Sequence, residues 1–262
     1  MNLRRDISTE LSTFGYKKIS NRNECFASDV FRLVENFFTD WRAMSRSDLI
    51  VSISKAQDVL NQENVHHRCI NDNLNLAEGF VASDKVSIQS VVYLRVVRPK
   101  ISKESEFLDF HRESFYCDQG YINYQINFHI PIYNYTAKTS MKLIKGSHVL
   151  NDDEIVYEKK DSVYSGVERF SEGHRVGLQY NPKVITRPGL YGPIEDCGAR
   201  VGDLFCFTTK LLHGGGINMS DDIRISLDFG IIASQNLFDM KEKHHASYSG
   251  GSHFVPLRVN GS

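Results

Sequence analysis

The sequence predicts a mainly β protein: a double-stranded β-helix of the jelly-roll or cupin-like type, preceded by α-helices. Two observations support this fold class. Apolar residues recur at helical spacing before residue 85, whereas alternating and β-branched segments dominate from residue 86 to residue 232. Helices followed by strands, without regular alternation of the two, are typical of a β-sandwich or jelly roll with flanking helices.

Length and composition set the broad class. The chain has 262 residues, of which 41% are hydrophobic and 24% charged, and its net charge is −1. These values are ordinary for a globular protein with a substantial core. They provide no electrostatic reason to expect nucleic acid or an anionic membrane as a partner. No apolar run could cross a bilayer and the N-terminal segment is polar, so we expect a cytoplasmic protein that binds a small molecule. The sequence leaves the oligomeric state open.

The five cysteines are scattered and odd in number, and no Cys-x-x-Cys pair occurs. That pattern argues against a disulfide framework and against a thiolate zinc site. We expect free thiols in a reducing compartment.

Residues 1–85 are expected to form the helical flank of a single domain that spans residues 1–262. A short edge strand is expected between Phe14 and Ile19. Ser28 is the expected N-cap of a first helix, and Ser47 opens a second, because apolar residues follow each at helical spacing.

Residues 61–85 are polar and rich in asparagine, and we expect them to form a loop. The adjacent His66 and His67 lie in this segment. Neighbouring side chains diverge, and histidines in a solvated loop are more often surface residues than ligands. We therefore assign them no metal role.

Residues 86–232 are expected to form the jelly-roll core. Alternating or β-branched residues indicate its strands, which cover 86–98, 108–116, 121–132, 140–144, 204–212 and 223–232.

Residues 149–196 are polar and contain three of the six prolines, so they are predicted to be a lid-like insertion, because long irregular segments in compact domains are usually functional. Residues 233–262 are expected to be a C-terminal tail that is loosely packed or attached at residues 254–257.

His111 and Glu113 form the first part of a candidate site. On a strand, residues two apart project to the same face, so these two side chains would point together and Arg112 away. An imidazole and a carboxylate side by side make two thirds of a 2-His-1-carboxylate iron site, which leaves positions open for substrate and oxygen. Because His-x-Glu is common by chance, the prediction depends on what the rest of the chain supplies.

His213 ends a predicted strand and is followed by three glycines, which tolerate positive φ or the close approach of another group. The next strand contains Arg224 and Ser226 on one face. We expect the two strands to be antiparallel neighbours, which would bring His213 and Arg224 to one end of the barrel. A guanidinium there could bind a carboxylate through two hydrogen bonds.

These motifs resemble those of the Fe(II)/2-oxoglutarate-dependent oxygenases, and more narrowly the phytanoyl-CoA dioxygenase-like superfamily. The resemblance lies in His111-x-Glu113 with the distal His213 and Arg224, in residues 127–131 with Gly-Ser-His at 146–148, and in residues 202–226. It covers roughly residues 86–232 and implies Fe(II), 2-oxoglutarate and O2 as cofactor and co-substrates.

The resemblance implies His111, Glu113 and His213 as iron ligands, and Arg224 with Ser226 as the site of the distal carboxylate of 2-oxoglutarate. His129 stands where many relatives have a tryptophan beside the co-substrate, and Tyr93 is expected to line the same cavity. Glu113 replaces the commoner aspartate, as in other members. The resemblance implies hydroxylation rather than halogenation, because halogenating relatives lack this carboxylate and bind halide in its place.

Two other functions remain open. A cupin-like isomerase or a 2-oxoglutarate-independent oxygenase could use the same three ligands, with Arg224 structural. A non-catalytic jelly-roll binding module could merely retain the motif. For an oxygenase, the polar insertion favours a small polar substrate, a sugar or amino-acid unit in a biosynthetic pathway.

Overall fold

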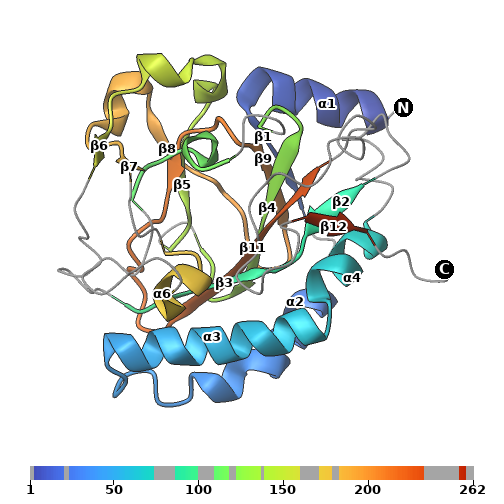
Figure 1. The fold of residues 1–262 in the computed structure, drawn as a ribbon, viewed down its shortest axis with the longest axis vertical. Coiled ribbons are helices and arrows are strands. Elements are labelled where there is room, and N and C mark those ends of the chain that lie inside the picture. Colours follow the sequence, from blue (N-terminus) through green and yellow to red (C-terminus); the bar gives the residue numbers. More distant parts are fainter. Residues whose placement is uncertain are drawn as a thin grey trace.

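The computed structural model is shown in Figure 1. It describes residues 3–20, 24–73, 86–99, 109–117, 122–136, 139–159, 171–178, 183–232 and 254–257. Much of the expected C-terminal tail and the middle of the expected insertion lie outside these residues.

An antiparallel sheet of seven strands forms the centre of the fold. Its order is β1-β9-β4-β11-β2-β12, and β3 also pairs with β11. The strands are β1 (Tyr16–Ile19), β2 (Ser87–Gln89), β3 (Tyr93–Val97), β4 (Gln125–Tyr133), β9 (Leu204–Thr208), β11 (Arg224–Ile232) and β12 (Phe254–Pro256).

Smaller sheets lie on the other side of the core. One has the order β10-β5-β8, and the other is the pair β6-β7. Their strands are β5 (Lys142–Ile144), β6 (Glu158–Lys159), β7 (Lys183–Val184), β8 (Ile194–Asp196) and β10 (His213–Gly214). Leu143 of β5 packs with Phe205 and Phe207 of β9, so an apolar core joins the main sheet to the β10-β5-β8 sheet. The predicted mainly β fold is confirmed.

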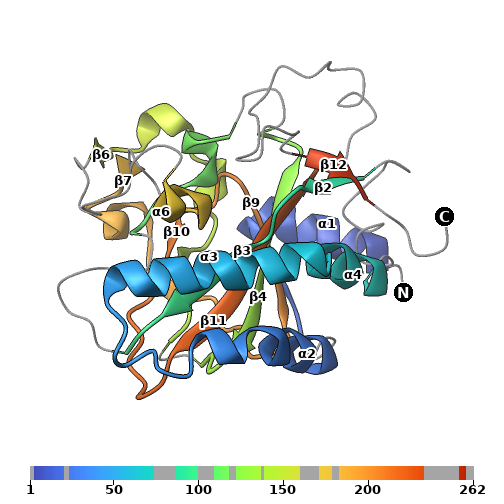
Figure 2. The same cartoon turned by 60° about the horizontal axis from the view of Figure 1, so that its bottom comes forward.

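Helices cover the opposite face of the main sheet, where α2 and α3 lie across it (Figures 1 and 2). The α-helices are α1 (Leu3–Phe14), α2 (Glu24–Val34), α3 (Arg46–Gln62), α4 (Val65–Asp72) and α6 (Glu172–Arg175). The 3₁₀ helices are η1 (Glu35–Phe37), η2 (Glu113–Phe115), η3 (Ser147–Val149), η4 (Asp152–Glu154) and η5 (Pro188–Tyr191). No described helix is long and apolar enough to cross a membrane.

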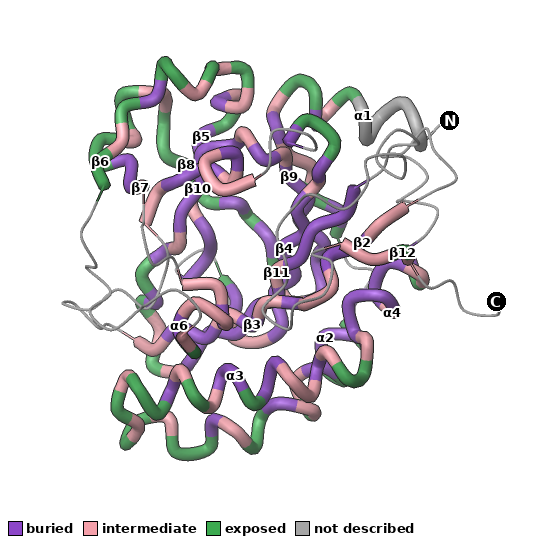
Figure 3. Tube along the Cα trace, in the orientation of Figure 1, coloured by how far each residue is buried: buried purple, intermediate pink, exposed green. Residues whose placement is uncertain are grey.

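Alternation along β4 and β11 separates the two faces of the main sheet. Phe128 and Phe229 point to the helices and belong to the apolar core there. Their neighbours His129 and Asp228 point to the other face, because successive strand residues face opposite sides. Both strands are buried along most of their length (Figure 3), so the inner face is a buried polar surface.

Helices α2 and α3 begin at residues other than the predicted ones. Helix α2 begins at Glu24, because Phe26 and Ala27 extend the buried face upstream, and Ser28 lies inside the helix. Helix α3 begins at Arg46, and its N-cap is Ser45 rather than Ser47. Helix α1 was not predicted from the sequence, whereas the expected edge strand is present as β1.

The prediction of a surface loop around His66 and His67 was wrong. Both residues belong to helix α4 and are buried. The His66 ring lies 6.0 Å from the ring of Phe229, measured between centroids. Burial, with His67 adjacent, lowers the pKa of His66 to about 3, so a neutral imidazole packs like an aromatic core residue.

The predicted strand 86–98 is divided into β2 and β3, and the predicted strand 204–212 ends at Thr208. The predicted attachment of residues 254–257 is confirmed. β12 pairs with β2, and the Leu257 amide donates to the Val86 carbonyl at 2.9 Å. All five cysteines are free thiols, as expected.

Candidate metal centre

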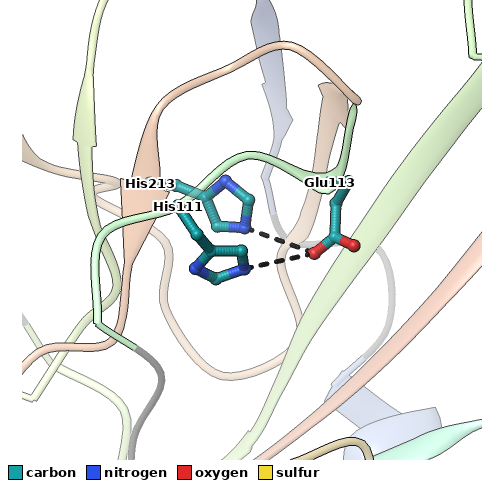
Figure 4. Close-up of side chains that lie close together, drawn as sticks. All are labelled: His111, Glu113 and His213. Carbon is teal, nitrogen blue, oxygen red and sulfur yellow. Dashed lines mark hydrogen bonds and ion pairs between the residues drawn. The ribbon is translucent and has the colours of Figure 1, made fainter. Parts of the chain in front are cut away.

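His111, Glu113 and His213 converge on one point (Figure 4). One potential ligand atom from each lies within 4.8 Å of the other two. Glu113 Oε1 is 3.4 Å from His111 Nε2 and 3.7 Å from His213 Nε2. Both imidazoles are 5% exposed, whereas the Glu113 side chain is 30% exposed, so the centre has one open side.

The backbone holds the two histidines together. His111 and His213 form an isolated antiparallel bridge, in which the amide of each donates to the carbonyl of the other at 2.9 and 3.1 Å. The prediction of a strand over residues 108–116 was wrong in this respect, because pairing stops at His111 and Glu113 opens η2. Arg112 nevertheless has extended dihedrals (φ −130°, ψ 143°), so its two neighbours point to the same side.

Hydrogen bonds at Nδ1 fix the tautomer of each histidine. His111 Nδ1 lies 2.6 Å from the Asp109 carbonyl oxygen, and His213 Nδ1 lies 2.9 Å from that of Leu211. A carbonyl oxygen only accepts, so each Nδ1 carries a proton and donates it. In a neutral ring the lone pair of Nε2 is then directed towards Glu113.

The charge state of the centre follows from its surroundings. Burial raises the pKa of the Glu113 carboxyl, but His111 and His213, when they are protonated at Nε2, outweigh burial and hold that pKa below its usual value. Burial lowers the pKa of His213, and His111 adds to this effect. Near neutral pH the centre therefore contains a carboxylate and a neutral His213.

This donor set fits a divalent metal. Two imidazole lone pairs and a carboxylate oxygen face one another, and such acceptors repel unless a cation lies between them. Three ligands at right angles with bonds of about 2.1 Å would have donor atoms about 3 Å apart. The observed separations of 3.4 and 3.7 Å are close to that spacing.

Arg224 and Ser226 form a second buried polar group on the inner face of β11. Arg224 Nη1 donates to the carbonyls of Thr139 and Gly216, and the guanidinium lies 5.6 Å from the centre of the Tyr135 ring. Arg224 Nε and Ser226 Oγ are buried without a hydrogen-bond partner among the described residues. Buried polar atoms are rarely left unpaired, so this pair is suited to a ligand oxygen.

The prediction that the His213 and Arg224 strands are antiparallel neighbours was wrong. β10 pairs with β5 in the small sheet, whereas β11 lies between β4 and β3 in the main sheet. The loop that follows His213 nevertheless contacts Arg224, because the Gly216 carbonyl accepts a hydrogen bond from the Arg224 guanidinium. A Cβ at Gly216 would lie 2.1 Å from the Ser140 carbonyl oxygen, so close approach, rather than positive φ, requires glycine there.

His129 is part of a hydrogen-bond network beside Arg224. Its Nδ1 donates to Asp228 at 2.6 Å, so Nε2 accepts from the Tyr135 hydroxyl at 2.7 Å. Arg95 Nε donates to the other oxygen of Asp228 at 2.8 Å. Burial alone would raise the pKa of Asp228, but His129 and Arg95 lower it to about 2. Both His129 nitrogens thus have protein partners, and its contact with a co-substrate stays a prediction.

Tyr93 lies on β3 opposite Asp228 and is half-buried. Burial raises the pKa of its phenol; Arg95 opposes this and the Glu113 carboxylate adds to it. Tyr93 therefore lies within electrostatic reach of the centre, although its predicted role remains untested.

Arg112, for which no function was predicted from the sequence, connects the segments that carry the ligands. It is 0% exposed and donates to the carbonyls of Lys210, Ser147 and Leu150 and to the carboxylate of Asp152 at 2.7–3.0 Å. The only sequence signal was its place between two candidate ligands.

No protein-family model matches the sequence, and no curated protein matches it. Solved structures do resemble it. The epimerase SnoN in complex with Fe3+, alpha ketoglutarate and nogalamycin RO has a TM-score of 0.59 at 14% identity, over 97% of this chain and 98% of that chain. AviO1 from Streptomyces viridochromogenes Tue57 has a TM-score of 0.55 at 15% identity, over 88% and 96%. Apo ThoJ, a non-heme monooxygenase, has a TM-score of 0.57 at 13% identity, over 87% and 77%.

At these identities the comparisons establish the fold. The antiparallel sheets match the jelly-roll fold of such structures, which confirms the predicted fold class. Membership of the phytanoyl-CoA dioxygenase-like superfamily stays a prediction.

Proposed function

We propose that this protein is a non-haem Fe(II)- and 2-oxoglutarate-dependent oxygenase that hydroxylates a small polar metabolite. One observation carries the proposal: two imidazole nitrogens and a carboxylate oxygen converge at His111, Glu113 and His213. That set is the one that binds Fe(II) while leaving positions open. The similar structure SnoN, which contains Fe3+ and alpha ketoglutarate, supports the choice of metal and co-substrate.

Arg224 and Ser226 would hold the distal carboxylate of 2-oxoglutarate. Their unpaired Nε and Oγ atoms supply two donors in a buried position, where charge-assisted hydrogen bonds are strong. Asp228, the next inner-face residue along β11, is already neutralised by Arg95 and His129. Its negative charge therefore does not preclude a carboxylate nearby.

With both groups bound, iron and 2-oxoglutarate would supply oxygen-dependent decarboxylation to succinate, coupled to substrate oxidation. The protein residues have simpler tasks. The Nδ1 hydrogen bonds aim both imidazoles, and Arg224 orients the co-substrate. Phe207, whose ring centre lies 4.7 Å from that of His213, shields that side from water. Since Glu113 occupies the carboxylate position, no ligand site is vacated for halide, which favours hydroxylation.

The proposal predicts metal-dependent consumption of 2-oxoglutarate. Protein supplied with Fe(II), 2-oxoglutarate and O2 should form succinate, lose this activity after chelation, and regain it on addition of Fe(II). Calorimetry with Mn(II) and 2-oxoglutarate measures binding when turnover without substrate is slow. Fe(II) binding without 2-oxoglutarate binding would favour an isomerase or a 2-oxoglutarate-independent oxygenase. Protein that binds no metal would be a binding module.

Arg224→Leu should weaken 2-oxoglutarate binding by about 30- to 150-fold, because a buried charged hydrogen-bond partner contributes about 2–3 kcal/mol. Mn(II) affinity should be unchanged. Binding of pyruvate, which lacks the distal carboxylate, should change far less. Arg175→Leu is the matched control, since Arg175 connects α6 to Asp58 and Ser54 of α3. If Arg224→Leu weakened the binding of 2-oxoglutarate and of pyruvate equally, Arg224 would not be the residue that binds the distal carboxylate.

A further inference from the structure

Two amides on the inner face of β4 continue the polar surface beyond His129. Cys117 Sγ donates to Gln125 Oε1 at 3.4 Å, and Gln125 Nε2 donates to Asn127 Oδ1 at 2.7 Å. This row ends at Asn127 Nδ2, which is buried and has no partner among the described residues. Asn127 is only 7% exposed.

A buried amide donor without a partner is unfavourable, because it has lost its hydrogen bonds to water and gained none in the protein. Gln125 Nε2 occupies one acceptor position of Asn127 Oδ1, so the group of Asn127 that remains without a partner is its N–H donor. A hydroxyl, ether or carbonyl oxygen of a bound molecule would satisfy it.

Each end of this row is linked to a metal ligand, one end through Phe207 and the other through the backbone. Asn127 pairs in register with Phe207 of β9, and the Phe207 ring meets the edge of the His213 ring. At the other end, the Cys117 amide donates to the Glu113 carbonyl at 2.9 Å. The amides therefore line the site next to the metal ligands rather than a separate region.

The opposing strand leaves room for the amides. Gly230 of β11 pairs with Asn127. A Cβ at Gly230 would lie 2.9 Å from Gln125 Nε2 and 3.3 Å from Asn127 Oδ1. The two amide groups occupy the space over this glycine.

The row is also electrically neutral. It consists of a thiol and two amides, and the carboxylate of Asp228 on the inner face of β11 is bonded to His129 and Arg95. No described residue of the row offers a charge to an ammonium or carboxylate group. Amides recognise uncharged oxygen-rich groups, whereas a charged substrate group would lose hydration without a countercharge.

We propose that Gln125 and Asn127 form the substrate-recognition wall of this site, and that the substrate is an uncharged polyhydroxylated molecule of the glycoside class. The inference rests on the proposed function and selects a sugar unit over an amino-acid unit. Asn127 donates to a substrate oxygen beside the metal, and Gln125 and Cys117 fix the orientation of its amide.

The test compares neutral methyl glycosides with their uronic acid counterparts, which differ by one carboxylate, and with free amino acids. Binding is measured by calorimetry and ligand-observed NMR on protein loaded with Mn(II) and 2-oxoglutarate without oxygen. At least one neutral glycoside should bind more tightly than its uronic acid and than any amino acid. Tighter binding of charged compounds, or no binding of any glycoside, would overturn the inference.

Two variants test the role of Asn127. Asn127→Asp keeps an oxygen that accepts from Gln125 but replaces the free donor with a second acceptor oxygen and a negative charge. Asn127→Leu removes the donor and the acceptor without adding charge. Each should weaken glycoside binding at least about tenfold while Mn(II) and 2-oxoglutarate affinities stay within about twofold. The exposed Asn36→Leu is the control. Unchanged glycoside affinity in Asn127→Asp refutes the donor role even if Asn127→Leu does not fold.

The two proposals fail separately. Wild-type protein that binds neither Mn(II) nor 2-oxoglutarate contradicts the proposed function. Protein that binds both but prefers charged compounds, or ignores glycosides, contradicts only the inference about the substrate.

Discussion

His213→Ala should lower the affinity for Fe(II) or Mn(II) at least about 100-fold and abolish succinate formation. Removing one of three ligands should exceed the 10- to 100-fold loss that outer hydrogen-bond partners of a metal site typically cause. The backbone bridge to His111 does not need the imidazole, so the fold should be retained. Metal content after dialysis and calorimetry with Mn(II) measure the effect.

His148→Ala is the matched control, because His148 bonds to the Ser12 carbonyl, outside the centre. Added Mn(II) should raise the Tm of wild type and His148→Ala, but not of His213→Ala, since a ligand that binds only the folded state stabilises it. Free imidazole should partly restore metal binding to His213→Ala. Full metal affinity in His213→Ala would refute the centre.

Arg112→Met should lower the free energy of unfolding by about 3–5 kcal/mol, because several acceptors lose their donor at about 1–3 kcal/mol for each one that is buried. Methionine keeps an unbranched side chain at this position, but it leaves the carbonyls of Lys210, Ser147 and Leu150 without their donor. Denaturant unfolding followed by circular dichroism measures the change.

Arg32→Met is the matched control, because Arg32 and Asp29 form an ion pair on the surface of α2 with side chains 74% and 55% exposed. Its removal should change stability by less than about 1 kcal/mol. Arg112→Met should also weaken Mn(II) binding, because Arg112 joins the His111 segment to the chain before His213. Equal stability of the two variants would show that the buried contacts contribute little.

Local patterns in the sequence were sufficient for much of the fold. The strands predicted over residues 121–132 and 223–232 agree with β4 and β11, because strand period is independent of context. Predictions that depended on context failed. The segment with His66 and His67 looks polar, yet packing against Phe229 makes it a buried helix. Ser28 looked like a cap, but the buried face of α2 begins upstream of it. Ser45, which forms a capping box with Asp48, caps α3 in place of Ser47.

By itself, the sequence determined the chemistry of the centre: a His-x-Glu pair, a distal histidine, and an arginine and serine two apart on one strand. The structure decided how they meet. His111 and His213 join through one bridge rather than neighbouring long strands, because their segments pair only there. The tautomers, the Arg112 contacts and the unpaired amide of Asn127 arise from residues far apart in sequence. Such contacts depend on tertiary packing, which no local pattern encodes.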